Sequence, residues 1–163
     1  VTILGRKVTW DVDGIKYEAD MKHRTKILEY FGFDEKTRRL GSNGDKGDKD
    51  EPWRQEPMDA GQAKEFRGLA ARLNYMSQDC PDLQFPIKQA SKEMASPTLG
   101  SLAEVKKVAR YLLDRSGLVW TFEWQDEPGQ AYVTTDSDWG GSLKDRRSTS
   151  GGAFMLGLSL IHI

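Results

Sequence analysis

Two short strands are predicted at the start of the chain, because hydrophobic and polar residues alternate there around a turn. The strands cover Val8–Trp10 and Ile15–Tyr17, and Asp13 and Gly14 lie between them. An Asp-Gly pair tolerates the positive φ angles that a tight turn requires. The pattern therefore predicts a β-hairpin within residues 1–19.

The spacing of hydrophobic residues becomes helical after this hairpin. A helix is expected over Met21–Phe31, with Asp20 as its N-terminal cap and Gly32 at its end. Three further amphipathic helices are predicted, and three such helices in a row form a small bundle around their apolar stripes. They cover Gln62–Ser77, a segment from Pro81 or Asp82 to Ala95, and Ser101–Leu113.

Alternation with period two returns at the end of the chain. Strands are predicted over Leu118–Trp124, from Ala131 to Asp136, and over Ser148–Leu156, with a turn at Glu127–Gly129 between the first two. The order of elements predicts an α+β fold: a hairpin and a helix, then a helical bundle, then an incomplete mixed sheet.

Between the first helix and the bundle, residues 34–60 contain glycines, prolines and interleaved charges, with almost no apolar residue to bury. We expect a mobile charged loop there. An interpretation as a calcium loop is disfavoured, because the regular ligand spacing of an EF-hand is absent.

Charge and cysteine content narrow the function classes. The chain has 24 Lys and Arg against 25 Asp and Glu, so any contact with nucleic acid must come from a local basic patch. The single cysteine, Cys80, excludes an internal disulfide and a cysteine-rich zinc site.

His23 lies in a charged stretch, so we expect it at a solvent-facing helix position. No apolar run is long enough for a membrane span and no signal peptide opens the chain, so we expect an intracellular protein without a membrane partner.

The most specific motif lies in residues 132–157, YVTTDSDWGGSLKDRRSTSGGAFMLG. This stretch resembles the start of the RNase H domain of copia-type LTR-retrotransposon Pol polyproteins. In that family a strand ends in Asp-x-Asp-Trp-Ala-Gly, and a short charged loop leads to Arg-x-Ser-Thr-Ser-Gly and an apolar strand. Gly140 stands where the family has Ala. The matching positions are Asp136, Asp138, Trp139, Gly141, Asp145, Arg146, Ser148, Thr149, Ser150 and Gly151.

Two other segments resemble the same polyproteins. The helical region is similar to the family's thumb and connection segment at Asn74-Tyr75, Pro81-Asp82, Pro97, Arg110-Tyr111-Leu112 and Gly117-Leu118. Ile3-Leu4-Gly5 with Val8 is similar to the primer-grip hairpin. The resemblance implies five regions: residues 1–33, the end of the reverse transcriptase palm with its hairpin and first thumb helix; 34–60, the charged loop; 61–117, the helical thumb or connection region; 118–157, the start of RNase H; and 158–163, a tail that departs from the family.

The resemblance also implies site residues. Asp136 would be the first carboxylate of the RNase H centre, a catalytic metal ligand for Mg²⁺, with Asp138 as the alternative ligand. RNase H chemistry needs several carboxylates around its metal ions, so one strand cannot supply the site alone. Lys106, Lys107 and Arg110, on the outer face of the last predicted helix, could follow a phosphate backbone.

Two functions therefore remain open from sequence. The first is a piece of an RNA-directed DNA polymerase with RNase H activity, which grips an RNA/DNA hybrid or template-primer, lacks both complete active sites and binds no Mg²⁺ tightly by itself. The alternative is a domesticated non-catalytic module that binds nucleic acid or another protein through its basic helix face and exposed tryptophans.

Overall fold

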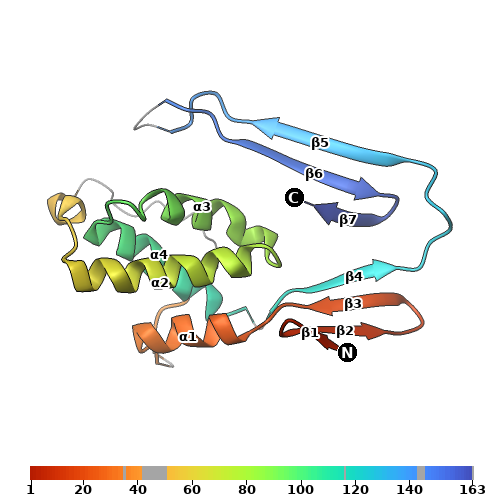
Figure 1. Ribbon diagram of the computed structural model, residues 1–163, viewed down its shortest axis with the longest axis horizontal. Helices are drawn as coiled ribbons and strands as arrows, with labels where there is room; N and C mark the ends of the chain where they lie inside the picture. The colour runs from red at the N-terminus through yellow and green to blue at the C-terminus, as the bar shows by residue number, and fades with distance from the viewer. Residues whose placement is uncertain (35, 42–50, 116, 143–145, 163) are drawn as a thin grey trace. The chain divides into compact units, whose positions relative to one another are not determined.

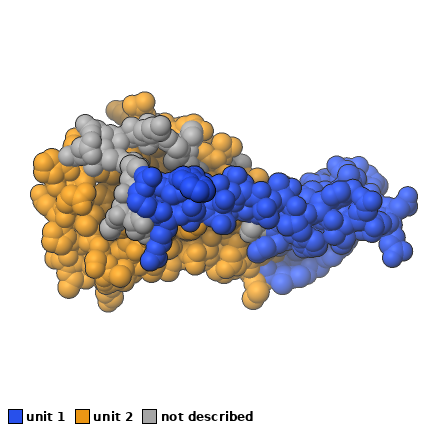
Figure 2. All heavy atoms as spheres, turned by 90° about the horizontal axis from the view of Figure 1, so that it is seen from above, with its two compact units in different colours: residues 1–3, 7–17, 119–163 blue, residues 4–6, 18–118 orange. Residues whose placement is uncertain are grey.

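The computed structural model describes residues 1–34, 36–41, 51–115, 117–142 and 146–162. This part of the chain forms four α-helices and two sheets of antiparallel strands, so the predicted α+β class is confirmed (Figure 1). The chain divides into two compact units, coloured separately in Figure 2. We call residues 4–6 and 18–118 the helical unit, and residues 1–3, 7–17 and 119–163 the sheet unit.

The helical unit contains the four predicted helices. They are α1 (Lys22–Phe31), α2 (Ala60–Ser77), α3 (Gln84–Lys92) and α4 (Leu99–Leu112), with short 3₁₀ turns η1 (Pro52–Gln55) and η2 (Pro81–Leu83). Their apolar stripes meet in one core, whose largest fully buried side chains are Ile27, Phe66, Leu73, Leu83, Ile87 and Val105. None of these helices, as far as the described residues go, is both long and apolar enough to cross a bilayer.

Side chains cap the first turns of α2 and α4. The Asp59 carboxylate accepts a hydrogen bond from the Gln62 backbone N–H at 2.8 Å, and the Gln62 side chain accepts one from the Asp59 backbone N–H. Thr98 and Ser101 form the same reciprocal arrangement at α4. Each box satisfies two N–H groups, and loss of such a cap costs about 1 kcal/mol.

The two capped helix starts lie side by side. The Met58 N–H donates to the Pro97 carbonyl at 3.1 Å, and the Leu99 N–H donates to the Glu56 carbonyl at 2.9 Å. A β-bridge between segments that are far apart in sequence therefore fixes where α2 and α4 begin.

The start of α1 differs from the prediction. Asp20 accepts a hydrogen bond from the Lys22 N–H at 2.9 Å, but the capping position is Met21, which makes no side-chain cap. Gly32 does end the helix, as predicted, in the left-handed conformation with φ of 58°.

Part of the segment expected to be a charged loop is packed into the helical unit. Leu40 is buried in the core, and Pro52–Gln55 forms η1. The Arg54 side chain, 10% exposed, pairs with Glu104 of α4. No pattern in the sequence indicates this packing, because isolated residues carry it. Residues 42–50 of the expected loop lie outside the described residues.

In the sheet unit, the first sheet has the strand order β1 (Thr2–Ile3), β2 (Arg6–Trp10), β3 (Gly14–Glu18), β4 (Val119–Glu123). The predicted hairpin is present, but its turn precedes Gly14, and the Asp11 carboxylate accepts hydrogen bonds from the Asp13 and Gly14 N–H groups. A Cβ at Gly14 would lie 2.1 Å from the Phe122 carbonyl oxygen. Gly14 is thus required by the close approach of β4.

The second sheet joins β5 (Ala131–Ser137), β6 (Ser150–Leu156) and β7 (Ser159–His162) in that order. The β5–β6 pairing runs from Ala131 opposite Leu156 to Ser137 opposite Ser150. The strand β7 was not predicted, since its residues depart from the family pattern. It forms because Gly157, with φ of 56°, turns the chain back against β6.

Candidate functional site

Asp136 lies one residue before the end of β5 and is exposed. Its partner across the sheet is Gly151, where an added Cβ would meet nothing within 4 Å. Directly opposed residues of an antiparallel pair share a face, so the space beside this carboxylate is open. The side chain is therefore placed to receive groups that approach this face.

Asp138 has a different environment, because it belongs to the connection between β5 and β6. Its carboxylate accepts a short hydrogen bond from the Thr149 N–H, and its own N–H donates to the Thr149 carbonyl at 3.1 Å. The two candidate carboxylates therefore have different structural roles. Asp138 hydrogen-bonds across the connection between β5 and β6, whereas Asp136 lies on the sheet.

The two halves of the motif are joined by further contacts. The Gly140 N–H donates to the Ser148 hydroxyl at 3.0 Å, and Gly140 has φ of 57°. A Cβ at Gly141 would lie 2.2 Å from a carboxylate oxygen of Asp138. Hydrogen bonds thus connect residues 138–141, the first half of the motif, to residues 147–150, the second half. The Trp139 side chain in the first half is 98% exposed.

A complete magnesium site does not arise from the described residues. Mg²⁺ takes oxygen ligands in near-octahedral geometry, and catalytic sites gather several carboxylates around it. Among the residues that the structure describes, no three His, Cys, Asp or Glu side chains come close enough to hold a metal ion. Asp136 alone does not fit a bound Mg²⁺, and a site there would need ligands from elsewhere.

The three predicted phosphate-binding residues lie on α4, but in different surroundings. Lys106 is exposed. The Lys107 ammonium lies 3.2 Å from a Glu104 carboxylate oxygen, and the Arg110 guanidinium donates to the Arg38 carbonyl at 2.7 Å. Lys106 and Arg110 are one turn apart and share a side of the helix, while Lys107 is directed to Glu104.

Several arginines of the helical unit bind backbone carbonyls, which sequence reasoning did not foresee. Arg24 donates to the carbonyls of Leu112 and Leu113 at the end of α4, at 2.9 and 3.2 Å. Arg67 donates to the Met94 carbonyl, just after α3, at 2.8 Å. These cations satisfy groups that helix ends leave without partners. No sequence pattern distinguishes such an arginine from a solvated one.

Two of the positions that carry the family resemblance contact one another. The Tyr111 hydroxyl donates to the Asp82 carboxylate at 2.6 Å, and the Arg115 guanidinium lies 4.7 Å from the centre of the Tyr111 ring. Burial, followed by the bond to Asp82, raises the pKa of Tyr111 above its ordinary value. Asp82 and Tyr111 thus connect the start of α3 to the end of α4, a structural role.

The prediction that His23 faces solvent on α1 is wrong. Its ring lies 4.5 Å from the ring of Tyr75, and its Nδ1 is buried without a hydrogen-bond partner among the described residues. Charged neighbours in the sequence favour exposure, yet the helix turns this one position towards α2.

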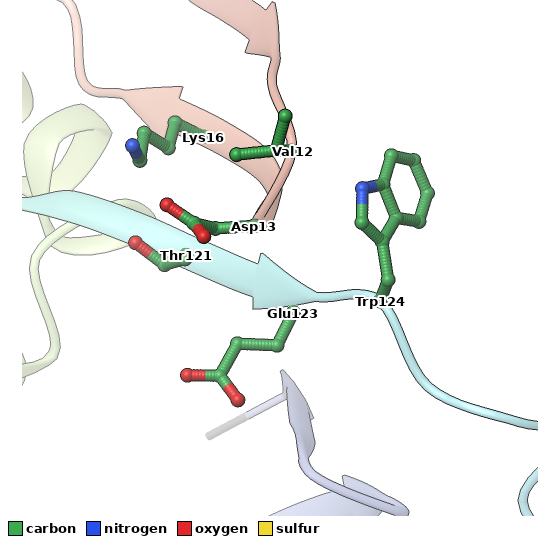
Figure 3. A pocket seen from close by; sticks show the side chains of 6 residues that line it. All are labelled: Val12, Asp13, Lys16, Thr121, Glu123 and Trp124. Carbon is green, nitrogen blue, oxygen red and sulfur yellow. The ribbon is translucent and has the colours of Figure 1, made fainter.

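A wide, shallow hollow lies in the sheet unit, shown in Figure 3. The Lys16 ammonium pairs with Asp11 at 2.5 Å, and the Trp124 indole N–H donates to the Asp11 carbonyl at 3.0 Å. The carboxylate of Glu123 and the ring of Trp124 point in different directions (Figure 3). The hollow gathers no set of described side chains with a common chemistry.

Cys80 is buried in the helical core, and its thiol should be inert in the folded chain. Burial, with the nearby Asp82 and Asp79 carboxylates, raises the pKa of the Cys80 thiol to about 12. Thiolate is the reactive form, so we expect an aromatic disulfide reagent at pH 8 to label the chain only after urea unfolds it. The raised pKa stabilises the fold below the ordinary thiol pKa, and that stability is lost as pH rises from about 8.5 towards 12. Rapid stoichiometric labelling of native chain would contradict this placement.

Comparison with known proteins places these features in context. No family model and no solved structure matches the chain. The chain is 30% identical to the retrovirus-related Pol polyproteins from transposons RE1 and RE2 of Arabidopsis thaliana, each over 95 residues that make up 57% of this chain and 6% of the polyprotein. It is 29% identical to an uncharacterized mitochondrial protein of the same plant over 99 residues, 60% of this chain and 40% of that protein.

The match thus spans 6% of the length of each polyprotein and 40% of the length of the mitochondrial protein. The resemblance to retrotransposon Pol polyproteins that was stated from the sequence is confirmed by these matches. These similarities support the resemblance of this chain to a piece of a copia-type retrotransposon Pol polyprotein.

Proposed function

We propose that the chain is the part of such a polyprotein in which the thumb or connection helices of the reverse transcriptase lead into the first strands of RNase H. The observation that carries the proposal is the motif of residues 132–157. It forms the β5–β6 hairpin, with Asp136 exposed on the sheet and the two halves of the motif bonded across one loop. The similarity to Pol polyproteins from two transposons supports the same assignment.

In this proposal each unit has one role. The helical unit grips an RNA/DNA hybrid through phosphate contacts from α4, and the sheet unit supplies Asp136 as one metal ligand. In a completed centre, Asp136 would hold Mg²⁺ together with carboxylates from elsewhere, and the metal would supply water activation and stabilisation of the leaving oxygen. The described carboxylates form no complete centre, and we expect the chain by itself to bind hybrid without cleaving it.

Weak, salt-sensitive binding of hybrid tests the gripping role. Of the three basic residues on α4, Lys106 and Arg110 are the pair that shares one side, so we expect about two phosphate contacts. Two contacts give a slope near −1.8 in log K against log salt for B-DNA and about the same for a hybrid. Fluorescence anisotropy with a labelled RNA/DNA hybrid measures the slope.

The double variant Lys106→Ala with Arg110→Ala should bring the slope close to zero. A Lys64→Ala variant, which changes an exposed lysine of α2, is the control and should keep the slope. Absence of hybrid binding at low salt, or a slope that the double variant leaves intact, would remove the gripping role from α4.

A further inference from the structure

A second surface of the helical unit combines an exposed aromatic ring with two lysines. Leu83, Ile87 and Ala90 form the buried stripe of the η2–α3 segment. Successive residues of a helix are about 100° apart around its axis. Three residues therefore lie within about 50° of the direction opposite the buried stripe: Phe85, Lys88 and Lys92. Phe85 is 60% exposed and both lysines are exposed. We call Phe85, Lys88 and Lys92 the α3 face.

The charge of the α3 face is one-sided. Within Pro81–Lys92 the same arc of the helix holds no carboxylate, because Asp82 lies outside it and bonds to Tyr111. Beyond the end of α3, the Glu93 carboxylate directly follows Lys92, and the Arg67 guanidinium, which donates to the Met94 carbonyl, offsets it. Lys88 and Lys92 therefore carry the charge of the face. The face therefore attracts anions.

Phe85 differs from Tyr30 and Trp53, the other exposed aromatic side chains in the described part of the helical unit. Tyr30 is 42% exposed and donates its hydroxyl to Glu65, and Trp53 is 40% exposed with the Arg54 guanidinium 5.3 Å from its ring centre. Phe85 is the most exposed of the three and carries no polar group that would favour water. Its ring therefore offers an open aromatic face on which a base can stack.

We propose that the α3 face binds single-stranded nucleic acid, with one unpaired base stacked on Phe85 and the adjacent phosphates beside Lys88 and Lys92. The two lysines are about 6 Å apart along the helix axis, which suits neighbouring phosphates of an extended strand. In a duplex the bases are stacked on one another and their faces are not accessible. Stacking on Phe85 requires an accessible base face, so this surface should prefer a single strand. This inference rests on the proposed function, since it adds a strand contact to a chain that grips hybrid through α4.

The test uses the full chain and a labelled 20-nucleotide thymidine oligonucleotide in fluorescence anisotropy. Stacking of one base is worth about 1–3 kcal/mol, so Phe85→Ala should weaken binding about 5- to 150-fold, whereas Phe85→Trp should bind at least as well as the unchanged chain. Because Phe85 is exposed, both variants should keep the helical circular dichroism signal.

The lysines are tested by salt dependence. Single strands contribute about 0.7 to the slope per phosphate, so Lys88→Ala with Lys92→Ala should lower its magnitude by about 1.4. The matched control, Lys22→Ala with Lys26→Ala, removes two exposed lysines of α1 and should leave the slope unchanged.

Equal oligonucleotide affinity for Phe85→Ala and the unchanged chain would overturn the proposal. Hybrid binding that depends on Lys106 and Arg110 but no single-strand binding would reject the α3 face alone. Single-strand binding that depends on Phe85 without hybrid binding would reject the gripping role and keep the α3 face.

Discussion

Metal-dependent cleavage of the RNA strand of a hybrid is expected when this chain is joined to the segment that follows the matching motif in a copia-type Pol polyprotein. The chain by itself should cleave nothing detectable. The chain has too few carboxylates at the site. Asp136 is exposed on β5, and the described residues place no further metal ligands beside it. Rigid elements of a completed domain would supply them. A labelled hybrid, incubated with Mg²⁺ and then with a chelator, provides the measurement.

In the extended chain, Asp136→Asn should lower the cleavage rate more than about 100-fold, since losing even an outer partner of a metal ligand costs about 10- to 100-fold. Asp138→Asn should be much milder. The amide oxygen that this substitution introduces can still accept the hydrogen bond from the Thr149 N–H, which is the contact that Asp138 makes in the loop.

Asp126→Asn is the matched control, because Asp126 is an exposed acid of the same unit, outside the motif. Its rate should stay within about twofold of the unchanged extended chain. Cleavage that survives Asp136→Asn, or that disappears only with Asp138→Asn, would reject the assignment of Asp136. An extended chain that folds, binds hybrid and never cleaves would favour the non-catalytic alternative.

Removal of the Arg6 side chain should destabilise the helical unit by about 3–5 kcal/mol, the usual cost of breaking a buried ion pair. The Arg6 guanidinium lies 2.8 Å from Asp79 and donates to the Tyr75 hydroxyl at 2.9 Å. The two charged side chains are only 13% and 6% exposed. Arg6→Ala leaves the buried Asp79 carboxylate without this cation, and urea unfolding followed by helical circular dichroism measures the cost.

Two comparison variants separate charge burial from general damage. Arg39→Ala breaks the Arg39–Asp114 pair, whose side chains are 58% and 42% exposed, and should cost at most about 1 kcal/mol. Arg6→Met with Asp79→Leu replaces both charges by apolar groups and should recover most of the lost stability. A loss below about 1 kcal/mol for Arg6→Ala would show that the pair contributes little.

The helices could be predicted from sequence because each carries an apolar stripe that the core needs. The stripe of α2, for example, reappears as the buried residues Phe66, Leu69 and Leu73. The exposure of Phe85 could also have been predicted from helical periodicity, because Phe85 lies outside the apolar stripe of its own helix. The strand β7 could not, because its place depends on a left-handed turn at Gly157 and on pairing with β6.

The candidate site was predictable only in its components. The motif gave Asp136 as the first carboxylate and Asp138 as the alternative. The structure adds that the Asp138 carboxylate accepts a hydrogen bond from the Thr149 N–H within the loop, whereas Asp136 lies on the strand β5. The basic residues of α4 looked equivalent in sequence, yet Glu104 and the Arg38 carbonyl engage two of them. The Glu104–Lys107 pair follows from the i, i+3 spacing of a helix. Arg38, however, lies 72 residues before Arg110 in the sequence, and helical periodicity carries no information on such a partner.

The bridge between the starts of α2 and α4 has a consequence for the order of folding. It joins Pro57 to Thr98, so the chain must close a long loop before these hydrogen bonds form. Closure of such a loop is entropically costly unless local structure shortens it first. The neighbouring helices α2 and α3 provide that structure, since contacts between adjacent elements form early in helical proteins. We therefore expect the bridge to form late, and its loss should speed unfolding far more than it slows folding.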